Sequence, residues 1–361
     1  MPADPFEQNS GLRCASSCVA QRTDTGQQPG HAWPTIPCSR VDVRHADSAA
    51  PPENEAKVPT VPLTSSGLPA LPAALDAQRI TFSGVHCYVA GVGPPLVLIH
   101  SINAASSAAE MRPVFERYRT THTVFAVDLP GFGHSDRSDR RYDPRLMTDA
   151  LHGLAAEVHR RFGATPIAAL ALSLGCEFLA RAAAEQPARW GRLAFVSPTG
   201  LSGMTPRRGP PGSTRTVPWL HALLSAKLWS RSLYRALTTP CVIRYFLQRT
   251  WGGKSIDESL WAYDVLTARQ PGARYAPLYF LSGSLFSQDI HRVYEAVSQP
   301  VWMSHGVRGD FNDFRGKCLV ADPGNWQTTV FQTGALPYYE VPAAFFQTFD
   351  AFLEGHSLER S

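Results

Sequence analysis

The sequence has 361 residues, of which 44% are hydrophobic and 18% are charged, and this composition is typical of a globular protein. The length fits one large domain with a tail or a small second domain. A formal net charge of +4 is too small to indicate nucleic-acid binding. The first residues contain no basic segment followed by an apolar run, and no stretch reaches the roughly eighteen apolar residues of a membrane helix, so we expect a soluble, cytoplasmic protein.

The cysteines form no recognisable pattern. Seven is an odd number, and their spacing does not repeat, which argues against a disulfide framework and for a reducing compartment. Cys14, Cys18, His31 and Cys38 are residue types that bind zinc, but the gaps between them are irregular. We expect no metal site, and because no dinucleotide fingerprint or phosphate-binding loop is present we expect no cofactor.

Residues 1–75 are rich in Pro, Ser, Ala and Gln and show neither a helical nor a strand period. Such a segment cannot bury enough apolar surface to offset the entropy lost on ordering. The sequence therefore predicts a disordered extension that is dispensable for folding.

The pattern changes at about residue 79. "RITFSGVHCYVAGVGPPLVLIHS" alternates and then becomes a continuous apolar run, and "TVFAVDLPG", "PIAALALS", "RLAFVSP", "PVWMSHG" and "TVFQTG" are further candidates for buried strands. Segments long enough for helices separate most of these runs, at about 106–119, 144–162, 174–187 and 342–354. Alternating strands and helices predict an α/β fold with a doubly wound, mostly parallel sheet, built from residues 76–199 and 271–357.

Residues 200–270 form an insert of different character, which we expect to be a helical cap over the edge of the sheet. Within it, residues 201–250 contain eight Lys or Arg and no Asp or Glu. "PWLHALLSAKLWSRSLYRALTTP" predicts one helix with Lys227, Arg231 and Arg235 in a single row. Two interpretations stay open: a solvated basic face, or a surface that attracts an anionic small-molecule substrate. Membrane contact through this basic cap is the less favoured alternative.

Ser173, in "ALALSLGCEF", directly follows a predicted buried strand and directly precedes a predicted helix. Ala171 and Gly175 flank it at two residues on either side, and both are small. A nucleophile elbow needs this pattern, because the strained turn brings the helix close to the strand. The alternative is a serine that only caps the helix, and the α/β context favours the nucleophile.

The strand in "PPLVLIHSINAASS" ends at His100 and Ser101. The backbone N–H groups of Ile102 and of Leu174, which follows the candidate nucleophile, are placed to stabilise a developing oxyanion. A histidine at the position of His100 is more often a structural tie for the loop than a base. A third element, "VDLPGFGHSD", contains Asp128 and a glycine-rich turn.

From about residue 79 to 355 the chain resembles the α/β-hydrolase superfamily, in the group with a helical lid between the sixth and seventh strands. "DLPGFGHSD", the elbow around Ser173 and the strand ending at Ile102 carry this resemblance. It implies an eight-stranded sheet with the cap inserted after strand six. In this family an acid follows the next-to-last strand, so the resemblance implies a catalytic role for Asp310, with Asp313 as the runner-up.

The resemblance also implies a histidine base in the turn after the final strand, but "TGALPYYEVP" has Tyr338 at the place where we expect it. A phenol with an ordinary pKa of about 10 accepts a proton from serine poorly at neutral pH. Three interpretations stay open. The first is a serine hydrolase of a small ester through Ser173, with a base such as His305; the second is a catalytically impaired relative that binds a ligand or partner; the third is a lyase on the same fold, with Tyr338 as acid.

Overall fold

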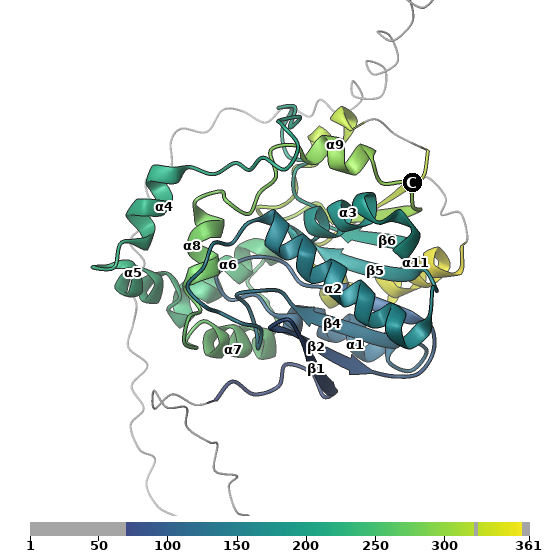
Figure 1. Ribbon diagram of the computed structural model, residues 1–361, viewed down its shortest axis with the longest axis horizontal. Helices are drawn as coiled ribbons and strands as arrows, with labels where there is room; N and C mark the ends of the chain where they lie inside the picture. Colours follow the sequence, from purple (N-terminus) through teal and green to yellow (C-terminus); the bar gives the residue numbers. More distant parts are fainter. Residues whose placement is uncertain (1–69, 321–323, 356–361) are drawn as a thin grey trace, which may run out of the picture. The chain divides into compact units, whose positions relative to one another are not determined.

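The computed structural model describes residues 70–320 and 324–355 (Figure 1). Residues 1–69 of the predicted disordered extension lie outside the described residues. So do the four candidate zinc ligands considered above, Cys14, Cys18, His31 and Cys38.

A single eight-stranded sheet runs through the described residues in the order β1-β2-β4-β3-β5-β6-β7-β8. β1 pairs antiparallel with β2 and β2 antiparallel with β4, and all later pairings are parallel. The predicted mostly parallel, doubly wound sheet is therefore confirmed. The strands are β1 (Gln78–Phe82), β2 (Val85–Ala90), β3 (Pro95–Ile99), β4 (Thr123–Asp128), β5 (Ile167–Leu172), β6 (Trp190–Val196), β7 (Val301–Gly306) and β8 (Trp326–Phe331).

Helices cover both faces of the sheet, and this explains the continuous apolar strands. In β3, Val97 and Ile99 belong to the core layer that contains residues of α2 and α3, whereas Leu96 and Leu98 belong to the layer with residues of α1 and α11 (Figure 1). A strand buried on both faces has no polar alternation. These helices are α1 (Arg112–Tyr118), α2 (Pro144–Phe162), α3 (Gly175–Glu185), α10 (Pro337–Glu340) and α11 (Pro342–Glu354).

The start of α2 shows how local sequence fixes an element boundary. Asp143 is extended, and its side chain accepts a hydrogen bond from the N–H of Leu146 (3.0 Å). Pro144 occupies the first helical position, where a missing N–H costs nothing. The predicted start of this helix at residue 144 therefore follows from its cap.

The prediction that the disordered extension reaches residue 75 is wrong at its C-terminal end. Ala74 and Leu75 are buried in the core layer that also contains Tyr88. The Ala74 N–H donates to the Tyr88 hydroxyl (3.0 Å), and the Ala74 carbonyl accepts from the Arg112 guanidinium (3.2 Å). Residues 70–75 lack a period because they pack as an irregular segment, so pattern alone does not reveal their burial.

The insert between β6 and β7, which we call the lid after its predicted role, consists of short helices and loops beside the sheet in Figure 1. Helical structure continues beyond residue 270, and the last helix, α9, packs against α3 of the core. The division of cap and core at residue 270 stays a prediction. The helices of the insert are α4 (Pro218–Ser225), α5 (Ser230–Leu237), α6 (Pro240–Trp251), α7 (Glu258–Thr267), α8 (Tyr275–Leu281) and α9 (Ile290–Glu295).

The prediction of one long basic helix in the lid is wrong. The chain becomes extended at Ala226 (ψ 127°), and the Trp229 indole donates to the Leu223 carbonyl at the end of α4 (2.8 Å). This turn redirects the chain and leaves Leu223 and Leu228 exposed. Lys227 lies between two helices and shares no helical row with the arginines of α5.

The positive charge of the lid is partly neutralised by acids from outside residues 201–250. Arg208 pairs with Glu295, and Arg244 pairs with Glu258 (both 2.5 Å between nitrogen and carboxylate oxygen). Arg249 pairs with Asp310, also at 2.5 Å. The basic character of the lid is therefore weaker than its sequence indicates. Within the part of the chain that the structure describes, no helix has the length and apolar composition needed to cross a bilayer.

Candidate active site

Ser173 lies in the strained turn between β5 and α3. Its φ angle is +54°, a left-handed conformation that a non-glycine residue rarely adopts. Its N–H donates to the Val196 carbonyl (2.8 Å), which ties the turn to the neighbouring strand. A Cβ at Gly175 would lie 2.6 Å from the His100 carbonyl oxygen, so the close approach of α3 to β3 needs glycine. This geometry has the features of a nucleophile elbow, where strain is stored at a functional site.

Two cavities meet at Ser173. The larger has a volume of about 330 Å³ and is lined largely by aliphatic and aromatic side chains, several of them from α5, α6 and α8 of the lid. The smaller lies between the end of β3, the loop after β8 and α6. The lid therefore encloses an apolar space that begins at the candidate nucleophile. Side chains common to both cavities are Ile102, Asn103, Ser173, Leu247, Thr250 and Phe311.

The two predicted oxyanion donors lie at this site. Ile102 and Leu174 both line the larger cavity together with Ser173. Leu174 caps the N-terminus of α3, where backbone N–H groups have no intrahelical partner. Both residues therefore lie beside Ser173 at the cavity wall, and the role of their N–H groups in stabilising an oxyanion stays a prediction.

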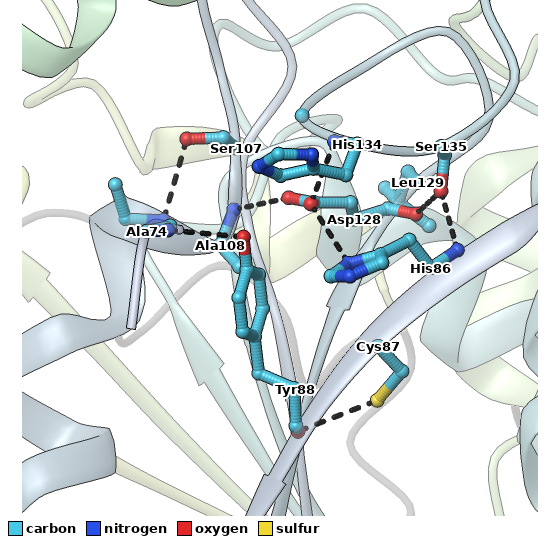
Figure 2. Close-up of polar contacts among 12 residues, drawn as sticks. Ala74, His86, Cys87, Tyr88, Ser107, Ala108, Asp128, Leu129, His134 and Ser135 are labelled. Atoms are coloured by element: carbon cyan, nitrogen blue, oxygen red, sulfur yellow. Dashed lines mark hydrogen bonds and ion pairs between the residues drawn. The ribbon is translucent and has the colours of Figure 1, made fainter. Parts of the chain in front are cut away.

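A buried polar cluster around Asp128 supports the loop that contains Ile102 (Figure 2). The carboxylate accepts from the N–H of Ala108 (2.8 Å) and of His134 (2.9 Å), and its Oδ2 lies 3.4 Å from Nδ1 of His86. Burial acts to raise the pKa of Asp128, but contacts with His86 and His100 and the two N–H groups bring it below its ordinary value. Asp128 is thus an ionised anchor for the start of the helical turn at Ala108–Met111.

His100 is a structural histidine, as the sequence suggested. Its Nδ1 lies 2.5 Å from the Ser101 carbonyl oxygen, and its Nε2 accepts a hydrogen bond from the N–H of Leu129 (2.9 Å). Both ring nitrogens are therefore occupied, and the imidazole ties the loop after β3 to the loop after β4. It lines neither cavity.

Glu110 is a site residue that sequence reasoning missed. It is buried, lines the smaller cavity with Ser173, and accepts hydrogen bonds from the N–H (2.7 Å) and hydroxyl (2.9 Å) of Ser101 and from Nδ2 of Asn103 (2.9 Å). Burial raises its pKa, and the neighbouring His100 and these hydrogen bonds oppose the rise. Glu110 organises the loop after β3 from within. The only sequence signal was an acid in an otherwise small and apolar segment, "NAASSAAEM".

Asp310, the predicted acid, lines the larger cavity with Ser173. Its two carboxylate oxygens bind the guanidinium of Arg249 at 2.5 Å each, and its side chain is 41% exposed. The runner-up, Asp313, lines neither cavity and instead binds Arg315, which lowers the pKa of Asp313 to about 2. The geometry therefore favours Asp310 over Asp313, and its catalytic role stays a prediction.

The structure does not bring His305 to Ser173. His305 lies at the end of β7, with Nδ1 2.9 Å from the Gly306 carbonyl oxygen and its ring stacked on Phe314 at 4.1 Å between centroids. Burial lowers its pKa, which favours the neutral ring. It lines neither cavity, so this geometry lends no support to His305 as the base.

Tyr338 is also away from both cavities. It is 1% exposed, packs against Tyr339 and Phe345, and its hydroxyl has no hydrogen-bond partner among the described residues. Burial raises its pKa well above the ordinary value, so it is a neutral phenol. Ala335 and Leu336, from the same loop after β8, line the smaller cavity with Ser173 instead. The assignment of the base position to Tyr338 stays a prediction, and Ala335 and Leu336 are the residues of this loop that line the smaller cavity.

No histidine among the described residues lines either cavity. The residues 70–320 and 324–355 also contain no group of three or more His, Cys, Asp or Glu side chains placed to hold a metal ion. Backbone groups of Ile102 and Leu174 and several carboxyl groups therefore line the cavities with Ser173, but no imidazole of the described residues does.

Comparisons with known proteins agree with this architecture. A family model described as the alpha/beta hydrolase fold matches residues 94–262. The pimeloyl-[acyl-carrier protein] methyl ester esterase of Xylella fastidiosa is 36% identical over 110 residues, which cover 30% of this chain and 38% of that relative. The match thus spans well under half the length of the curated relative.

Solved structures share the whole fold at low identity. Cfl2 from Burkholderia cenocepacia superimposes with a TM-score of 0.60 and 21% identity, covering 76% of this chain and 94% of the other. The 2-hydroxy-6-oxo-6-phenylhexa-2,4-dienoate hydrolase of Rhodococcus sp. strain RHA1 gives 0.59 and 18%, covering 75% and 95%. With its sheet order, its inserted helices and its strained serine turn, the chain has the α/β-hydrolase fold, and residues 94–262 match the family model of that fold.

Proposed function

We propose that this protein is a slow serine hydrolase that cleaves carboxylic esters with an apolar acyl chain through Ser173. The observation that carries the proposal is the φ of +54° at Ser173, a strained turn placed at the mouth of an apolar cavity. Strain of this kind persists only where the surrounding structure imposes it. The ester class is supported by the name of the Xylella relative, a methyl ester esterase.

The reaction follows acyl transfer. The Ser173 hydroxyl oxygen attacks the ester carbonyl carbon, and the N–H groups of Ile102 and Leu174 stabilise the oxyanion. Collapse of this intermediate breaks the bond to the alcohol and leaves an acyl-serine, which water then hydrolyses to the acid. The proton of the Ser173 hydroxyl passes to the departing alkoxide through water, since no histidine among the described residues lines the cavities. Without a base at hand, we expect slow turnover.

The missing imidazole also favours a second candidate function, a catalytically impaired relative that binds an apolar ligand under the lid. Such a protein would keep the cavity and the loop geometry but turn over esters at background rates. The third interpretation, a lyase with Tyr338 as acid, gains no support, because the Tyr338 hydroxyl is buried away from both cavities.

A fluorophosphonate probe tests the proposal, because it forms a bond with an activated serine. We expect the native chain to be labelled and Ser173→Ala to be unlabelled. Ser83→Ala is a matched control: Ser83 also has a positive φ, +48°, but lies in the turn between β1 and β2. Labelling that persists in Ser173→Ala would overturn the proposal. Labelling without turnover of p-nitrophenyl esters from acetate to decanoate would favour the second candidate.

A further inference from the structure

The lid contributes one acidic side chain, Asp264 of α7, to the wall of the larger cavity. Its side chain is almost completely buried, with 2% of the residue exposed. Its Oδ1 has no hydrogen-bond partner within the described residues. Burying a carboxyl oxygen without a hydrogen-bond partner costs free energy. When that oxygen lines a cavity, a bound ligand can supply the missing hydrogen bond.

The charges around Asp264 do not neutralise it. The other buried acid nearby, Glu110, repels it from the loop after β3, and Tyr339 of α10 is a neutral phenol. Arg249 also lines the cavity, but both oxygens of Asp310 already bind its guanidinium. Asp264 therefore faces the cavity without a basic partner among the groups packed around it.

The surroundings of the two buried acids decide which one holds a proton. Glu110 accepts three hydrogen bonds from Ser101 and Asn103, and these stabilise its ionised form. Asp264 receives no such bond at Oδ1, and burial together with the charge of Glu110 raises the pKa of Asp264 well above its ordinary value. Where two carboxyl groups have unequal surroundings, the less solvated one keeps the proton. Asp264 is thus a neutral carboxylic acid that has a hydrogen bond to donate.

We propose that Asp264 forms a polar subsite in the apolar cavity, and that it binds a neutral oxygen acceptor, a ketone or hydroxyl, carried within the acyl chain of the substrate. An acyl chain with such a group buries its carbons against the aromatic wall and pairs its oxygen with Asp264. A plain hydrocarbon chain leaves the carboxyl group unpaired. The substrate class is therefore an oxo- or hydroxyacyl ester. This inference narrows the substrate of the proposed ester hydrolase, and it rests on that function because it assumes that the ester group lies at Ser173.

The aromatic wall alone would also suit a protonated amine. The cation is disfavoured because an ammonium ion entering this cavity would lose its water and meet a neutral acid rather than a carboxylate. The two kinds of ligand require different side chains at position 264. A neutral acceptor needs a donor there, whereas a cation needs a negative charge.

Binding is measured by calorimetry in the Ser173→Ala background, so that turnover does not interfere. The probes are methyl decanoate, a series of methyl oxodecanoates with the ketone at successive carbons, and the matching aminodecanoates. We expect the best oxo ester to bind about 3- to 10-fold more tightly than methyl decanoate, as one hydrogen bond of typical strength implies. Asp264→Asn should keep this preference because its amide N–H donates, and Asp264→Leu should lose it. Thr267→Val, which removes another unpartnered buried oxygen from α7, should keep it.

The proposal is overturned if no oxo ester binds more tightly than methyl decanoate, or if the preference survives in Asp264→Leu. Tightest binding of an amine, abolished in Asp264→Asn, would replace the neutral subsite by a cationic one. If Asp264→Leu does not fold, the comparison of the oxo and amine series on the native side chain and on Asp264→Asn still decides between these outcomes. A clear oxo preference without hydrolysis of these esters by the native chain would retain the subsite and reject the hydrolase.

Discussion

Two regions of this protein divide the components of a hydrolase site between them. Around Asp128, a carboxylate lies with the imidazoles of His86 and His134, but the two cavities that meet at Ser173 do not reach these side chains (Figure 2). Around Ser173, a strained nucleophile, backbone donors and carboxyl groups line the cavities, without a histidine among the described residues. Residue types alone therefore do not locate a reactive site; what separates these two regions is that the cavities reach Ser173 and not the cluster around Asp128.

The two regions also treat their carboxyl groups differently. Asp128 has N–H donors and a neighbouring imidazole, so it stays ionised and anchors a loop. Asp264 has no donor to Oδ1 and faces an apolar cavity. The hydrogen bonds to Asp128 hold its loop rigid, whereas Oδ1 of Asp264 remains free to form a hydrogen bond with a ligand.

The largest expected effect is on activity and comes from supplying the missing imidazole. Ala335→His places a histidine on one of the two residues of the loop after β8 that line the cavity with Ser173, the other being Leu336. Since loss of a triad base costs on the order of 10⁶ in turnover, we expect this variant to raise ester hydrolysis by about 10³-fold or more. Turnover of p-nitrophenyl butyrate measures the gain.

Tyr338→His is the matched control, because position 338 is buried away from both cavities. We expect it to leave turnover unchanged and to lower stability. A gain in Tyr338→His instead of Ala335→His would show that Tyr338 occupies the position of the base. Loss of the Ala335→His gain in an Asp310→Asn background would support Asp310 as the partner of the new histidine.

Asp128→Ala should have the largest effect on stability. It leaves the N–H groups of Ala108 and His134 without their acceptor and removes the carboxylate beside the His86 ring. Each buried donor left without a partner costs about 1–3 kcal/mol, so we expect the free energy of unfolding to fall by about 3–5 kcal/mol. Denaturant unfolding measures the loss. Asp149→Ala, in an exposed pair with Arg145, should change it by less than about 1 kcal/mol, and equal effects of the two substitutions would contradict the anchoring role of Asp128.

Much of the fold was predictable from the sequence because its signals are local. The apolar runs, the cap at Asp143 and the small residues around Ser173 each depend on a few neighbouring residues. The position of Asp264 in the wall of the cavity was not predictable, because it depends on how α7 of the lid packs over the segment that contains Glu110. The break in the lid at Ala226 was missed for a similar reason: a leucine-rich period is equally compatible with one long helix and with two short ones.

The sequence also does not predict which residue of the loop after β8 occupies the position of the base. Ala335 and Tyr338 are three residues apart, and the sequence does not say which side chain the loop after β8 turns toward Ser173. Only the packing of Tyr338 against Phe345 of α11 settles that this phenol points into the core.

The next effect is on stability and concerns residues 70–75, which lie beside the cluster around Asp128. A chain that begins at residue 76 lacks Leu75 and the Ala74 N–H that binds Tyr88, whereas a chain that begins at residue 70 keeps both. Pro72, whose carbonyl accepts from His134 and Tyr263, is also lost. One buried leucine and these hydrogen bonds are worth about 2–4 kcal/mol, so the shorter chain should unfold at correspondingly lower denaturant concentration. Identical unfolding curves would mean that residues 70–75 contribute nothing to the core.

The two buried aspartates should give opposite pH dependences. The folded state raises the pKa of Asp264 above its unfolded value, so the native chain loses stability relative to Asp264→Asn as pH rises above about 4, by up to about 1.4 kcal/mol per pH unit. The folded state lowers the pKa of Asp128, so its advantage over Asp128→Asn is present above about pH 4 and shrinks as pH falls below that value. Unfolding in urea at several pH values measures both, and slopes of the same sign would remove the distinction drawn here.

The smallest effect belongs to the lid surface, where charge is exposed and not buried. Lys227, Arg231 and Arg235 lie at the surface of the lid, and we propose that they attract anionic ligands from a distance. Such attraction is screened over about 10 Å at 0.1 M salt, so replacing Arg231 and Arg235 by Gln should slow association of an anionic ester by only about twofold, and only at low salt. Stopped-flow association of a fluorescent fatty-acid ester carrying a distal carboxylate, with a neutral ester as control, measures this. A salt-independent change, or an equal change for both esters, would assign the arginines to the structure of α5 and would leave recognition to the cavity alone.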